Sequence, residues 1–159
     1  MASTITSATL TVTLTEKIEL NGTNHGSINT KTFDSINEIS KRIVTVTTAE
    51  SVIATFSAAV ASAGHYVAAD VRYIRFTNLD DSNFVTLTFR NQDNDEAAIK
   101  LDAGQSFIWN GDNANGMTAV MNATQDADAA SSTNFGSLTN IQADADTAAC
   151  DMEMVIASV

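Results

Sequence analysis

The clearest alternation of apolar and polar residues runs from residue 71 to residue 109. A period of two is typical of β-strands, whose successive side chains point to opposite faces of a sheet. Short polar residues, which stabilise turns, separate the alternating runs. The predicted strands are 71–77, 84–90, 97–101 and 105–110, and the predicted turns are 78–83, 91–96 and 102–104. Because these turns are short, the pattern predicts an antiparallel meander.

Strand patterns also occur on both sides of this stretch. Residues 8–14 alternate strictly, and Leu10, Val12 and Leu14 are expected to point inward. The apolar period changes within residues 35–47, which predicts a helical turn or bulge near 37–41 before a strand at 42–47. Further strands are expected at 17–20, 49–56, 116–121, 135–142 and 150–156, with a turn at 21–26, an irregular connection at 57–70 and a loop at 123–134.

These patterns together indicate the fold class. About eight to ten short strands, spaced at about eight to twelve residues with little helix, predict an all-β antiparallel β-sandwich of jelly-roll type. Residues 10–159 are expected to form this single domain. Residues 1–9 are polar and are predicted to form an extended N-terminal arm, which could add a strand to a neighbouring subunit, or else a frayed terminus. Deleting 1–9 is then expected to weaken assembly without unfolding the domain.

The charge of the chain is strongly uneven. The net charge is −11, and residues 91–159 hold 11 acidic residues with Lys100 as their single base. Such a surface repels phosphate, so neither nucleic acid nor an anionic membrane is an expected partner. The charged fraction of 17% suits packing against copies of the same chain, or simply a sandwich rich in small residues. The N-terminus lacks the pattern of a secretory signal, which favours synthesis in a cytoplasm.

The residues that could support catalysis form no recognisable motif. His25 and His65 each lie beside glycine, forty residues apart, and are expected in surface loops. No G-x-S-x-G pattern marks a nucleophile, and the lone Cys150 lies in an apolar run that predicts a buried thiol. We therefore expect no catalytic residue, no cofactor and no zinc site.

Calcium and sugar binding are the alternatives that the sequence leaves open. Acidic loops offer oxygen ligands, but none has the spacing of an EF-hand loop. The acidic segments are 93–96, 112–115, Asp126 with Asp128, and Asp144 with Asp146. Trp109 or Tyr73 could stack on a sugar, although a core position is the commoner role of such residues. The nineteen acidic residues include no pair that sequence can single out for glycoside hydrolysis.

Four segments carry a resemblance to a known family. They are SINEISKRIVTVTT (35–48), VRYIRFTNLDDSNFVTLTFRN (71–91), IKLDAGQSFIW (99–109) and DMEMVIAS (151–158). In these segments the chain resembles small virion structural proteins of tailed, marine-type bacteriophages. The resemblance implies a non-enzymatic jelly-roll subunit of the virion, synthesised in the host cytoplasm, with no catalytic residues to carry over.

The resemblance also implies partners. We expect the chain to bind other copies of itself, as a trimer by analogy, and the major capsid or tail protein. A capsid decoration or cement subunit is the first expectation, and a tail or fibre component is the alternative. A carbohydrate-binding or glycan-cleaving module is the alternative from another class.

Overall fold

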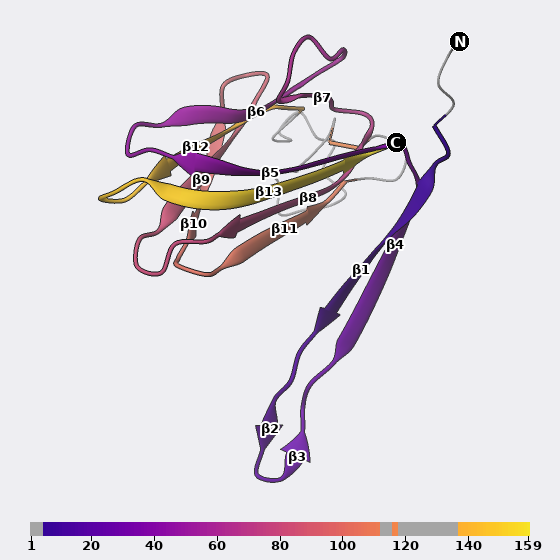
Figure 1. Ribbon diagram of the computed structural model, residues 1–159, viewed down its shortest axis with the longest axis vertical. Helices are drawn as coiled ribbons and strands as arrows, with labels where there is room; N and C mark the ends of the chain where they lie inside the picture. Colours follow the sequence, from indigo (N-terminus) through magenta and orange to yellow (C-terminus); the bar gives the residue numbers. More distant parts are fainter. Residues whose placement is uncertain (1–4, 112–115, 118–136) are drawn as a thin grey trace, which may run out of the picture.

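The chain forms two stacked β-sheets and a long two-stranded ribbon that projects from one end of them (Figure 1). The computed structural model describes residues 5–111, 116–117 and 137–159. No helix occurs in these residues, and the predicted all-β antiparallel sandwich is confirmed. The strands are β1 (Ala8–Thr15), β2 (Glu19–Leu20), β3 (Thr23–Asn24), β4 (Ile28–Ile36), β5 (Glu38–Val46), β6 (Ser51–Ser57), β7 (His65–Val67), β8 (Val71–Asn78), β9 (Val85–Asn91), β10 (Glu96–Leu101), β11 (Ser106–Asn110), β12 (Leu138–Ala145) and β13 (Cys150–Ser158).

The two sheets of the sandwich contain five and four strands. Their orders are β10-β9-β12-β6-β7 and β11-β8-β13-β5. All pairs are antiparallel except β6 with the short edge strand β7. Apart from β7, the strands of the sandwich pair in a nested order along the sequence, the first with the last and the middle two with each other. The pairs are β5 with β13, β6 with β12, β8 with β11 and β9 with β10. The sandwich is therefore one long hairpin folded over itself.

The core lies between the two sheets and follows the alternation seen in the sequence. On β13, the side chains of Cys150, Met152, Met154 and Ile156 are at most 1% exposed, as their period of two predicted. The largest fully buried side chains are Phe76, Ile74, Leu87, Met117, Leu138, Ile141, Met152, Met154 and Ile156. Burial of each such side chain contributes about 1.5–3 kcal/mol.

The predicted meander of residues 71–110 is wrong. Strands β8 and β9 lie in different sheets, and so do β10 and β11, so only β9 and β10 form a hairpin. Both connecting loops, the six residues 79–84 and the four residues 102–105, cross from one sheet to the other. Packed sheets are separated by about 10 Å, which four extended residues can span. Buried Asn78 joins the two crossings, because its side-chain N–H donates to the carbonyls of Asn83 at 2.8 Å and Leu101 at 3.1 Å.

Asn78→Ala is expected to lower the free energy of unfolding by about 2–3 kcal/mol. The change leaves the carbonyls of Asn83 and Leu101 without the amide that now satisfies them. It also removes the oxygen that accepts from the Asp80 N–H at 3.0 Å. Urea unfolding measures the change. Asn140→Ala, on the outer face of the five-stranded sheet, is the control and should change stability by less than about 1 kcal/mol.

The period change in residues 35–47 comes from a strand irregularity of the bulge type, one of the two predicted alternatives, but it lies at Ser35 and not at 37–41. Glu38–Val46 is one continuous strand, so the predicted helical turn at 37–41 is wrong. The irregularity lies at Ser35, whose φ is 62°, where the pairing of β4 with β1 shifts register. Here the chain passes from the ribbon into the sandwich, and its apolar side chains change the surface against which they pack.

Three further predicted segments are residues 57–70, 116–121 and 123–134. Residues 57–70 are an irregular connection that contains only the short strand β7. Gly116 and Met117 are the only described residues of the strand predicted at 116–121, and Met117 is fully buried. The loop predicted at 123–134 lies outside the described residues.

Candidate functional site: a projecting ribbon

The base of the ribbon packs on the outer face of the four-stranded sheet. Phe33 and Ile36 of β4 are 2% and 3% exposed, and they cover Tyr73 of β8 and Ala157 of β13. The rings of Phe33 and Tyr73 lie 6.1 Å apart. The half-buried side chains around this cluster are Leu10, Val12, Val155 and Val159. This base cluster is the contact that orients the ribbon.

The ribbon leaves the sandwich beyond this cluster (Figure 1). Strands β1 and β4 pair antiparallel, with Leu10 opposite Phe33 and Thr15 opposite Ile28. One face carries Leu10, Val12 and Leu14. Leu10 and Val12 are half-buried, whereas Leu14 is 53% exposed. The expectation that Leu14 points into a core is therefore wrong, because no part of the described chain covers this end of the strand.

The tip of the ribbon gathers further exposed apolar side chains. Ile18, Leu20 and Ile28 are 54%, 58% and 71% exposed. The predicted turn at 21–26 is present: Asn21 and Gly22 both have positive φ and join β2 to β3. A two-stranded ribbon is only marginally stable by itself in water, and grouped apolar side chains on a surface are typical of contact sites. The ribbon is therefore the strongest candidate for a contact with another protein.

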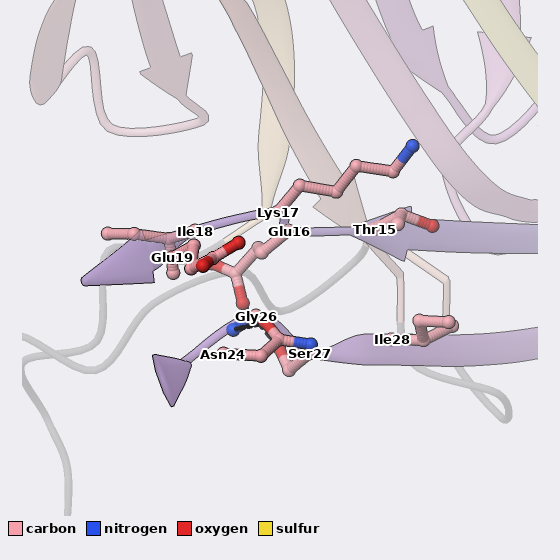
Figure 2. A pocket seen from close by; sticks show the side chains of 9 residues that line it. All are labelled: Thr15, Glu16, Lys17, Ile18, Glu19, Asn24, Gly26, Ser27 and Ile28. Carbon is pink, nitrogen blue, oxygen red and sulfur yellow. Dashed lines mark hydrogen bonds between the residues drawn. The ribbon is translucent and has the colours of Figure 1, made fainter. Parts of the chain in front are cut away.

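A pocket of about 610 Å³ opens between the strands near the tip (Figure 2). The Ser27 hydroxyl donates to the Glu16 carboxylate, and the Glu16 N–H donates to the Ser27 carbonyl at 2.8 Å. A Cβ at Gly26 would lie 2.2 Å from the Glu16 carbonyl oxygen, so this close approach requires glycine. The lining has one ammonium group, on Lys17, and two carboxylates, on Glu16 and Glu19. It has no histidine, cysteine or aromatic ring.

The outer face of the four-stranded sheet mixes apolar and charged groups. Ile39, Ile43 and Ile108 are exposed on it. Between them, Glu153 pairs with Lys41 at 3.0 Å and with Arg75. Hydrogen bonds from Lys41 and then from Arg75 lower the pKa of the Glu153 carboxyl. This face continues from the base cluster of the ribbon and is a second surface suited to protein contact.

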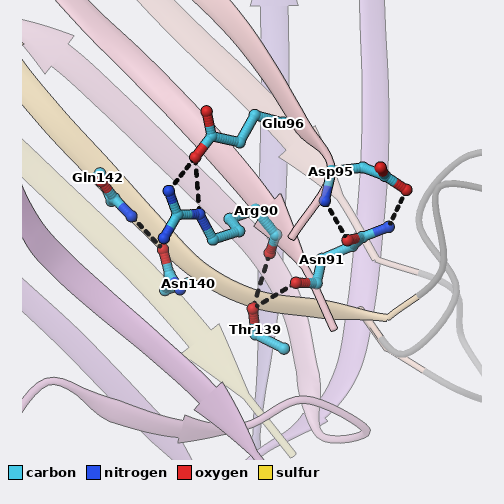
Figure 3. A network of polar contacts seen from close by, with 7 residues as sticks. All are labelled: Arg90, Asn91, Asp95, Glu96, Thr139, Asn140 and Gln142. Carbon is cyan, nitrogen blue, oxygen red and sulfur yellow. Dashed lines mark hydrogen bonds and ion pairs between the residues drawn. The ribbon is translucent and has the colours of Figure 1, made fainter. Parts of the chain in front are cut away.

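The outer face of the five-stranded sheet carries a network of polar side chains (Figure 3). Arg90 pairs with Glu96, and its Nε lies 2.7 Å from the carboxylate. Thr139 donates to the carbonyls of Arg90 and Asn91, both at 3.0 Å. The side-chain amides of Gln142 and Asn140 lie 3.1 Å apart. These groups largely satisfy one another.

The acidic segments proposed as calcium ligands do not converge in the described part of the chain. No group of three His, Cys, Asp or Glu side chains there could hold a metal ion. In the loop 91–96, the Asn91 amide bonds the Asp95 carboxylate at 3.2 Å. Burial, and then the charge of Glu50, raises the pKa of Asp144. Residues 112–115, Asp126 and Asp128 lie outside the described residues.

The residues considered for catalysis are also separated. His25 lies in the ribbon after β3, and His65 begins β7 in the sandwich rather than lying in a loop. Cys150 is buried as predicted, and burial, followed by the Asp80 charge, raises the pKa of its thiol. The Asp80 carboxylate itself accepts from the N–H groups of Asn83 at 2.7 Å and Ser82 at 2.9 Å. These bonds lower its pKa and hold the loop between β8 and β9.

The two aromatic residues considered for sugar binding contribute to packing. Tyr73 is 5% exposed under the ribbon, and burial raises its pKa. Trp109 is half-buried and packs edge-on against Phe89, with ring centres 5.3 Å apart. Tyr73 therefore offers no face to a sugar in this structure.

Comparison of the chain with protein-family models, with curated proteins and with solved structures finds no match in any of the three. No helix that is long and apolar enough to span a membrane occurs among residues 5–111, 116–117 and 137–159.

Proposed function

We propose that the chain is a non-enzymatic structural subunit of a tailed-phage virion, and specifically a capsid decoration or cement subunit. The observation that carries the proposal is the projecting ribbon, with its exposed apolar tip and its base held on the sandwich. A rigid domain with a long arm is suited to joining subunits, because the arm reaches a neighbour while the domain keeps its shape.

The finer fold class is part of the proposal. We infer a jelly roll, and the nested pairing of β5 with β13, β6 with β12, β8 with β11 and β9 with β10 supports it. Jelly rolls consist of eight strands in two sheets and are common in viral capsid and lectin domains. Fold alone does not assign function, so the ribbon and the sequence resemblance carry the virion assignment.

The proposed partners follow from the same features. The ribbon and the outer face of the four-stranded sheet bind other copies of the chain and the major capsid or tail protein. By analogy with closed assemblies of decoration subunits, the copies form a trimer. The subunit is made in the host cytoplasm and resides in the virion.

Locating the chain in intact particles tests this function. Mass spectrometry of purified virions should detect the chain at a copy number matching the symmetry of the capsid shell, and cryo-electron microscopy should find it on the outside of the shell. A copy number matching the tail, with density on the tail, would replace the decoration role by the tail or fibre role. Absence of the chain from purified particles would overturn the virion assignment.

A further inference from the structure

The edge strands of this fold differ in their protection against pairing with another chain. Native sheets protect their edges with charged residues, inward-pointing charges or short strands. The edges β5, β10 and β4 carry charged residues, whereas β11 and β7 are short, with five and three residues. The charged residues are Glu38, Lys41 and Arg42 on β5, Glu96 and Lys100 on β10, and Lys31 and Asp34 on β4.

Strand β1 has none of these protections. Its eight residues, ATLTVTLT, include no charge, no proline and no glycine. Its pairs are with β4 only, so its other edge has no strand partner in the described part of the chain. The threonines at 9, 11, 13 and 15 are all exposed. Among the strands that the structure describes, β1 is thus the long edge strand that is open to pairing.

The sequence of β1 indicates which strand fits this edge. Residues 9–15 read TLTVTLT, a palindrome centred on Val12. If a second copy of this segment pairs antiparallel about Val12, identical or matching residues lie opposite one another. The pairs are Thr9 with Thr15, Leu10 with Leu14, Thr11 with Thr13, and Val12 with Val12.

This register satisfies both faces of the resulting sheet. Because side chains alternate with a period of two, all leucines and valines lie on one face and all threonines on the other. Exposed Leu14 gains Leu10 of the second copy as a cross-strand neighbour, and the threonine pairs can hydrogen-bond. Glu16 lies opposite Ala8, so no like charges oppose each other within residues 8–16.

We propose that β1 pairs antiparallel with β1 of a second copy of this chain, across a two-fold axis at Val12. Two ribbons then form a four-stranded sheet in the order β4-β1-β1-β4. Such a two-fold contact is isologous and self-limiting. The contact goes beyond the virion role, because it concerns two copies of the chain wherever they reside. Trimeric sandwiches joined by it would form hexamers or larger assemblies.

Disulfide trapping in the purified full-length chain tests the register. Val12→Cys should form a covalent dimer under mild oxidation, because paired residues lie about 4.5–5.5 Å apart between Cα atoms, within disulfide reach. Leu14→Cys is the matched control and should not form one, since two copies of residue 14 are offset by four residues, about 13 Å. The native Cys150 is buried and does not compete. Failure of the Val12 variant to cross-link, or equal cross-linking of the Leu14 variant, would overturn the pairing.

Charge substitution tests the pairing without a cross-link. Thr11→Lys with Thr13→Lys places two like-charged pairs across the axis and should weaken self-association by about tenfold or more. Thr11→Glu with Thr13→Lys places opposite charges there and should restore association. In a parallel, in-register pair, residue 11 would face residue 11, and this second variant would also be disrupted. Both sites are exposed, so circular dichroism should show an unchanged fold.

Sedimentation of the unmodified chain and of both variants gives the readout. Self-association of the unmodified chain, lost in the double-lysine variant and regained in the charge-swapped variant, is the expected result. A monomeric unmodified chain at high concentration, or a double-lysine variant that associates normally, would contradict the proposal. These measurements need no virion, so their failure and the failure of the virion role are separate results.

Discussion

Phe76→Ala is expected to lower the free energy of unfolding by about 3–5 kcal/mol. Phe76 lies on β8, is fully buried, and is among the largest side chains between the two sheets. Removing its ring leaves a cavity that the surrounding strands cannot close, because β8 is paired on both sides, with β11 and with β13. Urea or thermal unfolding of the full-length chain measures the loss.

Ile43→Ala is the matched control for this prediction. Ile43 lies on the outer face of the same sheet and is 63% exposed, so its truncation should change stability by about 0.5 kcal/mol or less. Equal losses at the two positions would contradict the assignment of the core to the space between the sheets. If Ile43→Ala instead reduces association while stability stays constant, the outer face takes part in contacts.

The faces of the sandwich strands could be predicted from sequence, but their partners could not. Alternation on β8 and β13 identified the buried rows that include Phe76 and Met154, because one strand face must exclude water wherever the strand is placed. The same alternation is expected whether two consecutive strands pair in a hairpin or lie in different sheets. The choice between them is made by Asn78, a buried amide whose two acceptors lie 5 and 23 residues away in the chain.

The ribbon shows a second limit of the sequence pattern. The alternation of Leu10, Val12 and Leu14 is the same whether their face covers a core or is exposed for contact with another protein. The partner strand β4 offered a signal, since Ile28, Phe33 and Ile36 are its only large apolar residues and cannot fill one continuous face. The sequence predicts an arm at residues 1–9, whereas the projecting element comprises residues 8–36. The structure describes only residues 5–9 of that predicted arm.

The chemistry of the acidic loops was also beyond sequence reasoning. Runs such as 93–96 resemble sets of oxygen ligands for a cation. Side chains within the loop can, however, form hydrogen bonds with the same residues. The Asn91 side-chain oxygen accepts from the N–H groups of Asp93 and Asp95, at 2.9 and 2.8 Å, and orders the turn. Whether a carboxylate binds a cation or its own neighbours depends on the loop conformation, which composition does not specify.

Removing the ribbon is expected to abolish assembly while the sandwich remains folded. A chain that begins at Phe33 keeps Phe33 and Ile36 over Tyr73 and Ala157, and it loses β1 and most of β4. Within the described residues, β1 and β4 pair only with each other, so no strand of the two large sheets loses a partner there. Circular dichroism should show the sandwich unchanged, with a loss of stability of about 1–2 kcal/mol from the half-buried Leu10 and Val12.

The tip offers a control that separates two ways in which the ribbon could act. Leu20→Ser with Ile28→Ser keeps both long strands but replaces two of the most exposed apolar side chains of the tip. If the tip makes the contact, this variant should fail to bind particles as completely as the truncated chain does. If β1 makes the contact through its free edge, the tip variant should assemble normally and only the truncated chain should fail. Normal binding by both variants would exclude the ribbon from assembly and leave the outer face of the four-stranded sheet, with Ile39 and Ile43, as the surface to test next.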